Sequence, residues 1–279
     1  MTRERLTITL KPELLRLLDT MIDGAKIRNR SHAIEYILAK HLIPEQIKVL
    51  ILAGGAGIKL RPITYELPKC LIPIHGRPLL EQTFDILKKY NLKDVAIATG
   101  HLGDKIKNHF SDGTKFNMKI TYHIGNPQKP GTANPIVAAK SYAKNNPFIV
   151  IYGDVLADID YIDLIEFHKS HRGVATMALT SVEAPMDWGV VTLQGSRIVK
   201  FEEKPKKRVT SHLINAGIYV FNPSVFNYLA NGQRMLEHDL FPRLAEEGKL
   251  YGYPFEGQWF DIGTPAVYER VIKEWKETR

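Results

Sequence analysis

The chain has 279 residues, of which 44% are hydrophobic and 24% charged, with one cysteine and a formal net charge of +8. This balance excludes a largely disordered chain, and the lone Cys70 excludes an intrachain disulfide. No run approaches the roughly 18 apolar residues that span a bilayer, and the N-terminus lacks the apolar segment of a secretory signal. We therefore expect a cytoplasmic protein with no membrane contact, whose basic surplus suits a polyanion such as nucleic acid or a phosphorylated small molecule.

The first predicted elements are a strand and two short helices. Residues 5–10 alternate between polar and apolar side chains, which is typical of a strand with one buried face. Apolar residues at helical spacing then predict a helix that begins at Pro12 and ends at Gly24. A second helix is predicted with Ser31 as its N-cap, and Pro44 ends it.

These three elements bury too little apolar surface to fold alone, and a single strand leaves both of its edges unpaired. Pairing with the same strand of a second chain meets both needs. The layout of residues 3–43 resembles the ribbon-helix-helix family of DNA-binding proteins. The resemblance implies a homodimer whose paired strands enter the major groove of a DNA operator; a domain that only dimerises is the alternative. The residues implied in DNA contact are Arg5, Thr7, Thr9, Arg28, Arg30 and Ser31.

The sequence pattern changes after this segment, which predicts a domain over residues 1–45 and a second over 46–279. Residues 47–52 are a nearly continuous apolar run, typical of a buried parallel strand. Helical and apolar extended segments then alternate, which predicts an α/β sheet with helices on both faces. The expected helices cover residues 79–90, 136–144 and 265–275, and further strands cover residues 95–98 and 148–152.

A glycine-rich segment follows the first strand of this domain. Gly54, Gly55 and Gly57 let backbone N–H groups approach an anion closely, because no Cβ intervenes. Lys59 and Lys69 follow within twelve positions of Gly57, and cations beside a glycine loop suit a polyphosphate. The glycine spacing matches neither the P-loop nor the dinucleotide-binding fingerprint.

Longer stretches are more specific than the loop alone. Those stretches are residues 52–64, 67–74 and 78–80, Gly131-Thr132-Ala133, residues 152–158, residues 188–191, residues 201–205, residues 215–219 and residues 259–265. In this order they resemble the sugar-phosphate nucleotidyltransferase family. The resemblance implies a Rossmann-like, glycosyltransferase-A-like α/β mixed sheet flanked by helices and preceded by the small ribbon-helix-helix domain. It also implies a Mg²⁺-dependent reaction that joins a nucleoside triphosphate (NTP) to a sugar 1-phosphate and releases pyrophosphate.

The resemblance also implies roles for individual residues. The nucleotide would be bound by Leu52, Gly54, Gly55, Gly57, Lys59, Gly131, Thr132 and Ala133, with Asn126 or Gln128 reading the base. The sugar phosphate would be bound by Gly189, Glu203, Lys204 and Asn215, the metal by Asp154 and Asp261, and the catalytic groups would be Lys59, Lys69 and Asp154. Independently of the family, Asp154 follows an apolar strand, and the C-terminal ends of strands are where α/β sheets place their sites. Two carboxylates can hold one Mg²⁺ against phosphate oxygens.

The chain departs from the family pattern at two places. The family usually has Thr-Arg where this chain has Ile58-Lys59, and a lysine offers one point of contact where arginine offers a fork of donors. Either Lys59 or Arg61 could then reach the phosphates. Asn134 and Pro135 follow Gly-Thr-Ala, where the family often has glycine, and are predicted as the N-cap and first residue of a helix.

Two functions therefore remain open. One is synthesis of a nucleoside diphosphate (NDP)-sugar, with mannose 1-phosphate and GTP favoured over glucose 1-phosphate with dTTP or UTP. The other is a DNA-binding regulator whose nucleotidyltransferase-like domain is an impaired sensor of nucleotide or sugar nucleotide.

Overall fold

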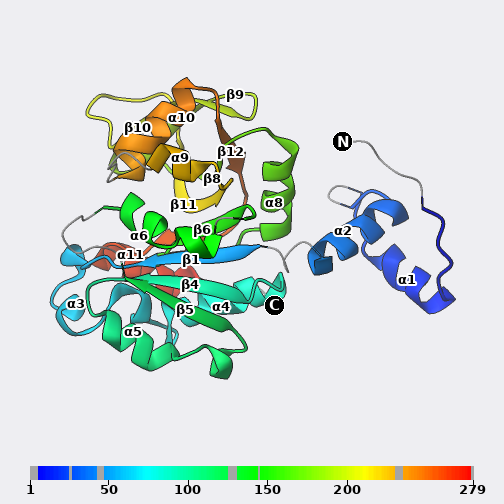
Figure 1. The fold of residues 1–279 in the computed structure, drawn as a ribbon, viewed down its shortest axis with the longest axis horizontal. Coiled ribbons are helices and arrows are strands. Elements are labelled where there is room, and N and C mark those ends of the chain that lie inside the picture. The colour runs from blue at the N-terminus through cyan, green and yellow to red at the C-terminus, as the bar shows by residue number, and fades with distance from the viewer. Residues whose placement is uncertain are drawn as a thin grey trace.

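The computed structural model describes residues 6–24, 27–42, 47–124, 131–143, 145–229 and 235–277. Figure 1 shows a small N-terminal lobe made of α1 (Pro12–Thr20) and α2 (Arg30–Leu42) beside a larger lobe built around a sheet. Within the described ranges, no helix is both long enough and apolar enough to cross a membrane.

The described residues form one nine-stranded mixed sheet in the larger lobe. Across the sheet, its strands are β5 (Lys119–Ile124), β4 (Asp94–Thr99), β1 (Lys48–Ala53), β6 (Phe148–Tyr152), β11 (Leu213–Phe221), β8 (Ala175–Ser181), β12 (Leu250–Pro254), β10 (Arg197–Glu203) and β9 (Gly189–Gln194). The first four are parallel to one another, and β11 runs antiparallel to β6. The expected mixed α/β sheet is therefore confirmed.

Both faces of the sheet are covered, as the alternating pattern predicts. Along β1, Val49 and Ile51 enter one hydrophobic cluster and Leu50 enters the other, because successive strand residues point to opposite faces. The first cluster packs beneath α4 (Leu79–Lys89), α5 (Gly103–Phe110), α8 (Tyr161–Ser170) and α11 (Pro265–Glu274). The second packs beneath α6 (Ala133–Ala138), α7 (Lys140–Ala143), α9 (Val225–Leu229) and α10 (Phe241–Glu246).

Most predicted elements of this lobe are present, but the single helix expected over residues 136–144 is two helices, α6 and α7. The predicted strands at residues 95–98 and 148–152 correspond to β4 and β6, and the predicted helix at 79–90 corresponds to α4. The helix predicted to start after Asn134 begins instead at Ala133, so Asn134 lies inside the first turn and does not cap it. Thr132 takes the N-cap position, and its hydroxyl is held by groups from a distant turn.

The N-terminal lobe differs from its prediction in two ways. A strand was expected over residues 5–10, and residues 6–10, the described part of it, form no strand in this single chain. The second helix begins at Arg30, and the Asn29 side chain accepts the His32 backbone N–H at 2.9 Å, so Asn29 takes the capping role expected of Ser31. Asparagine and serine cap helices about equally well, so the pattern alone does not decide between neighbouring candidates.

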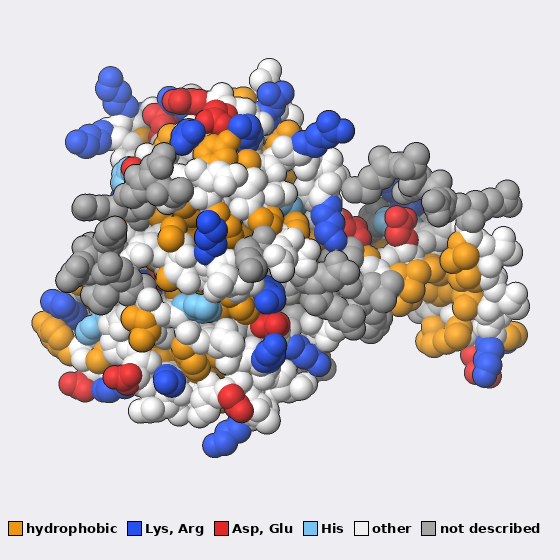
Figure 2. Space-filling view, in the orientation of Figure 1, with side chains coloured by type: hydrophobic (Ala, Val, Ile, Leu, Met, Phe, Trp, Pro, Cys, Tyr) orange, Lys and Arg blue, Asp and Glu red, His pale blue; other side chains and the backbone are white. Residues whose placement is uncertain are grey.

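The small lobe leaves much of its apolar surface exposed. Among its described residues, the buried hydrophobic cluster consists of Leu18, Ile27 and Ala33. Leu6 is 77% exposed and Leu17 is 61% exposed, and Figure 2 shows hydrophobic side chains gathered over this lobe. Exposed apolar surface of this kind marks a contact with another molecule.

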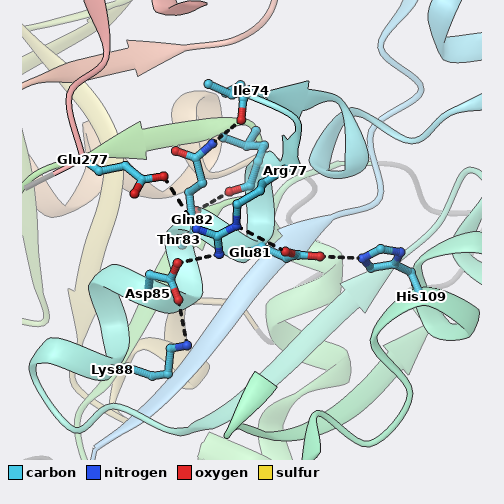
Figure 3. Close-up of polar contacts among 10 residues, drawn as sticks. Ile74, Arg77, Glu81, Gln82, Thr83, Asp85, Lys88, His109 and Glu277 are labelled. Carbon is cyan, nitrogen blue, oxygen red and sulfur yellow. Dashed lines mark hydrogen bonds and ion pairs between the residues drawn. The ribbon is translucent and has the colours of Figure 1, made fainter. Parts of the chain in front are cut away.

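An ion network joins the segment after the glycine loop to the end of the chain (Figure 3). A short hairpin, β2 (Pro73–Ile74) and β3 (Arg77–Pro78), leads into α4. The Arg77 guanidinium donates to Asp85 of α4 at 2.6 Å and lies 3.6 Å from the Glu277 carboxylate. Gln82 of α4 donates to the Ile74 carbonyl at 2.7 Å. These contacts fix the hairpin against α4.

Candidate active site

Two carboxylates meet at the C-terminal edge of the parallel strands. After β6 the chain turns through Gly153 and Asp154 into β7 (Val155–Ala157), which pairs antiparallel with β13 (Trp259–Asp261). Asp261 lies opposite Val155 in this ladder, and the Ile262 N–H donates to the Asp154 carbonyl at 2.8 Å. The small sheet therefore brings Asp261 beside Asp154.

Lys69 joins this pair from the loop side. Its ammonium group donates to the Asp154 carboxylate. Burial lowers the pKa of Lys69, but the charges of Asp154 and then Asp261 raise it above its usual value. Burial raises the pKa of Asp261 above its usual range, and the charge of Asp154 raises it further. The two carboxylates repel each other, so this position favours a bound cation.

The pair fits a divalent cation that also binds substrate. Within the described part of the chain, no group of three or more His, Cys, Asp or Glu side chains could hold a metal. Mg²⁺ usually takes one or two protein carboxylates and fills its remaining positions with phosphate oxygens and water. Asp154 and Asp261 supply a donor set of that kind.

A cavity of about 740 Å³ opens beside these groups. Of the residues predicted for the site, it is lined by Leu52, Gly54, Gly55, Lys69, Gly131, Thr132 and Asp154. Gly100, His101 and Tyr152 also line it. The glycine loop, the Gly-Thr-Ala segment and the end of β6 therefore form one concave surface, although they are far apart in the sequence.

The loop residues need glycine where other segments of the chain approach closely. A Cβ on Gly57 would lie 2.7 Å from the Thr64 side chain and 2.8 Å from that of Lys69, and its φ of +61° is left-handed. A Cβ on Gly100 would lie 2.8 Å from the Gly54 carbonyl oxygen. These contacts are shorter than side chains tolerate, so glycine lets the loops after β1 and β4 touch.

The two candidate phosphate-binding cations lie apart from the cavity wall. Lys59 is exposed on a short 3₁₀ turn (Ile58–Leu60), and Arg61 stacks over the Tyr65 ring at 4.8 Å. Among the residues that the structure describes, neither lines the cavity as Lys69 does. Lys69 is thus the cation that the fold brings to the carboxylates.

The predicted sugar-binding residues gather at the ends of β9 and β10. Gly189 pairs with Glu203, and a Cβ on Gly189 would lie 2.9 Å from the Glu203 carboxylate. Burial, and then the charge of Glu237, raise the pKa of Glu203. Lys204 has a left-handed φ of +44° directly before Pro205, and its N–H donates to the Trp188 carbonyl at 3.0 Å. Strained backbone of this kind is concentrated at functional sites.

Asn215 lies in an irregular part of β11. The pairing with β8 shifts between Asn215 and Tyr219, and the Asn215 side-chain oxygen accepts the Gly217 N–H at 3.0 Å. The Trp259 indole donates to the Ala216 carbonyl at 2.9 Å, which ties this bulge to β13. The bulge therefore lies next to the strand that carries Asp261.

Sequence reasoning did not identify Glu237, which is buried behind the cavity wall. Tyr152 and Thr132 both donate to the buried carboxylate of Glu237, which lies in a π-helical turn (Leu236–Leu240). The charge of Lys69 lowers the pKa of Asp261 against the effect of burial, and the Trp188 side chain lowers it to a smaller extent. The available signal was an acidic residue directly after Leu236, which is a common pattern by itself.

The structure describes only some of the remaining predicted residues. Asn126, Gln128 and Arg5 lie outside the described residues. Thr7, Thr9, Arg28, Arg30 and Ser31 are exposed on the small lobe. The Arg30 guanidinium forms a bidentate pair with Asp19 at 2.7 and 2.8 Å, so it is already engaged within the lobe.

Comparison with known proteins gives one family over most of the chain. The profile described as nucleotidyl transferase matches residues 48–278. Mannose-1-phosphate guanyltransferase beta-A of Xenopus laevis is 34% identical over 227 residues, covering 80% of this chain and 62% of that protein. Mannose-1-phosphate guanylyltransferase 1 of Arabidopsis thaliana is 36% identical over 229 residues, covering 80% and 63%. The chain thus spans less than two thirds of the length of these relatives.

Solved structures agree on the fold. A candidate glucose-1-phosphate thymidylyltransferase of Bacillus anthracis, determined with sucrose, superposes with a TM-score of 0.73 at 27% identity, covering 84% of this chain and 98% of that one. HddC of Yersinia pseudotuberculosis superposes with a TM-score of 0.71 at 23% identity, covering 82% and 100%. The second likeness shows the fold alone.

Proposed function

We propose a reaction from the premise that this chain belongs to the nucleotidyl transferase family: it transfers a nucleotidyl group from an NTP to a sugar 1-phosphate. The products are an NDP-sugar and pyrophosphate. The observation that carries the proposal is the meeting of Asp154, Asp261 and Lys69 beside the cavity of the glycine loop. Like-charged carboxylates, a partly buried ammonium and a cavity with room for a nucleotide together suit phosphoryl chemistry.

The chemistry needs alignment more than a covalent intermediate on the protein. A phosphate oxygen of the sugar 1-phosphate attacks the α-phosphorus of the NTP, and the bond between that phosphorus and the bridging oxygen of pyrophosphate breaks. The backbone of Gly54 and Gly55 would cradle the triphosphate, and Lys69 would neutralise charge that develops at the reacting phosphate. Lys59, on the exposed turn after the glycine loop, would contact the leaving pyrophosphate.

Mg²⁺ is the cofactor that we propose for the carboxylate pair. Bound there, it would neutralise phosphate charge and align the two substrates. On the sugar side, Lys204 would contact the 1-phosphate, while Glu203 accepts hydrogen bonds from sugar hydroxyls. Gly189 and Asn215 would shape the pocket around the ring. Asn126 or Gln128 would read the base.

We favour mannose 1-phosphate with GTP as substrates, since the curated relatives described above are mannose-1-phosphate guanylyltransferases. Glucose 1-phosphate with dTTP or UTP comes next, since a structural neighbour is described as a thymidylyltransferase. Pyrophosphate release across four NTPs and both sugar 1-phosphates, with Mg²⁺, tests the proposal. Turnover with one pair and its loss in Asp154→Asn is the expected result. Nucleotide binding without any turnover would overturn the proposed enzymatic activity and would support a role as a nucleotide sensor.

We further propose that residues 1–45 are a separate ribbon-helix-helix domain that pairs two copies of the chain and contacts DNA. The exposed apolar side chains of Leu6 and Ile8 support it, because they alternate as a strand does and need a partner strand. Arg5, Thr7 and Thr9 would then face the bases. Protection of a short palindromic operator at physiological salt is the expected result, whereas sequence-blind binding lost at moderate salt would leave only the dimer role.

A further inference from the structure

A buried carboxylate lies behind the wall of the cavity and bonds to two residues of that wall. Glu237 is 8% exposed, and its two oxygens accept hydrogen bonds from different parts of the chain. One oxygen accepts from the Thr132 hydroxyl at 2.7 Å, and the other accepts from the Tyr152 phenol. Both donors line the cavity, whereas Glu237 touches it only through them.

The contact with Thr132 is reciprocal. The Thr132 oxygen also accepts the Leu236 backbone N–H at 2.9 Å, so its hydroxyl both donates to and accepts from the turn that carries Glu237. The side chain of Thr132 is therefore occupied within the protein. Its contribution to a nucleotide would come from the backbone of the loop, whose position the turn determines.

The contact with Tyr152 reaches the catalytic edge. Tyr152 is the last residue of β6, two positions before Asp154. Its phenol donates to the Glu237 carboxylate, which lies in a turn far along the chain. One carboxylate thus joins the segment before α6 to the strand end that carries Asp154.

The local backbone supports a special role for this residue. Glu237 lies in a π-helical turn, a rare conformation that is frequent at functional sites. A charged group this buried is retained at a cost unless its hydrogen bonds are satisfied. Hydroxyl groups from two cavity-lining residues satisfy both of its oxygens.

We propose that Glu237 is a positioning residue that holds the Gly131–Ala133 segment against the end of β6 in the geometry that binds the NTP. The inference rests on the proposed nucleotidyl transfer, which supplies the NTP. Its loss would loosen the nucleotide wall of the cavity and would act on the sugar side only through its charge beside Glu203.

Glu237→Gln, which keeps the volume and one acceptor, tests this directly. Charge-assisted hydrogen bonds of this kind correspond to about a 5- to 30-fold change in an equilibrium. We expect the KM for the NTP to rise by about that factor, and the KM for the sugar 1-phosphate to change by a smaller factor. Glu237→Ala should be worse than Glu237→Gln, because it retains no acceptor. Glu246→Gln, an exposed change on the following helix, is the control.

Hydrogen–deuterium exchange of residues 131–139 without substrates provides a readout that does not depend on turnover. Faster exchange in Glu237→Gln and in the isosteric Thr132→Val supports the positioning role of Glu237. A less-than-additive effect in the double variant shows that both substitutions act through one contact. Unchanged exchange in both variants would overturn it, as would a change confined to the KM for the sugar 1-phosphate. A wild-type protein without turnover would refute the proposed function alone. The exchange measurement would still test whether Glu237 positions residues 131–133.

Discussion

The backbone N–H of Ile262 donates to the carbonyl oxygen of Asp154 at 2.8 Å, and this bond sets the distance between two carboxylates that are far apart in the sequence. β7 and β13 are each only three residues long, yet their pairing puts Asp261 beside Asp154. The charges of these groups raise the pKa of Lys69, which binds Asp154. The small sheet therefore organises the charged centre of the site.

Asp261→Asn should separate activity from stability. The variant removes a metal-binding carboxylate, so we expect kcat/KM to fall by about 100-fold or more. It also removes repulsion with Asp154, so the metal-free variant should unfold at a higher temperature than wild type. Steady-state kinetics and thermal unfolding in EDTA measure the two effects. A lower unfolding temperature with retained activity would show that Asp261 is structural.

Lys59→Met and Arg61→Met should differ in their effect on the NTP. Arg61 already stacks on Tyr65, whereas Lys59 extends from the turn after the glycine loop. We expect Lys59→Met to lower kcat/KM for the NTP by about tenfold, and Arg61→Met by less than about threefold. Lys59→Arg should retain activity because it keeps the charge. The reverse order would assign the phosphate contact to Arg61.

Gly189→Ala should weaken sugar binding. The new Cβ would lie 2.5 Å from the Phe201 ring and 2.9 Å from the Glu203 carboxylate, so Glu203 must move. We expect the KM for the sugar 1-phosphate to rise by about tenfold, with a smaller change in the KM for the NTP. Thr192→Ala, an exposed change on the same strand, is the control. Equal effects on both substrates would indicate a general loss of folding.

Stability should fall in mild acid because of His168. Burial, and then the charges of His171 and Lys169, lower the pKa of His168 to about 4, and its ring nitrogen lies 2.9 Å from the Thr176 hydroxyl. In the unfolded chain a histidine titrates near 6.5, so the unfolded state binds more protons between pH 6.5 and 4. The stabilisation is fully present above pH 6.5 and is lost as the pH falls towards 4.

We expect this loss to reach about 3 kcal/mol of the free energy of unfolding between those pH values. Urea unfolding of wild type and His168→Gln at pH 7, 5.5 and 4.5 measures it. The glutamine variant should be less stable at pH 7 but show a shallower fall. Parallel curves for the two proteins would assign the pH dependence to other groups.

The sequence predicted the parts of the fold that depend on local pattern. The apolar run at residues 47–52 and the period of residues 79–90 gave β1 and α4 with nearly the right ends. Asp154 was placed at a strand end by the apolar run before it, without reference to the rest of the chain. Such elements are predictable because strand and helix periods are written in consecutive residues.

The contacts that assemble the site could not be predicted in this way. Thr132 and Glu237 are 105 residues apart, and their bond determines where α6 starts, so Asn134 was wrongly expected to cap it. Ser31 was displaced as the cap by Asn29, one of several equally suitable neighbours. Where tertiary contacts choose between equivalent local options, the pattern alone does not decide.

The proposed dimer should depend on one face of residues 6–10. Leu6 and Ile8 are 77% and 45% exposed in the single chain, and pairing with a second copy would bury both beneath the helices of the dimer. We expect the Leu6→Asp, Ile8→Asp double variant to be monomeric, because charges do not enter such a core. The matched variant Thr7→Asp, Thr9→Asp alters the opposite face and should remain dimeric while losing DNA binding through repulsion of phosphates. Analytical ultracentrifugation measures the oligomeric state, and electrophoretic mobility shifts measure DNA binding. A dimeric Leu6→Asp, Ile8→Asp protein would show that the copies associate through another surface.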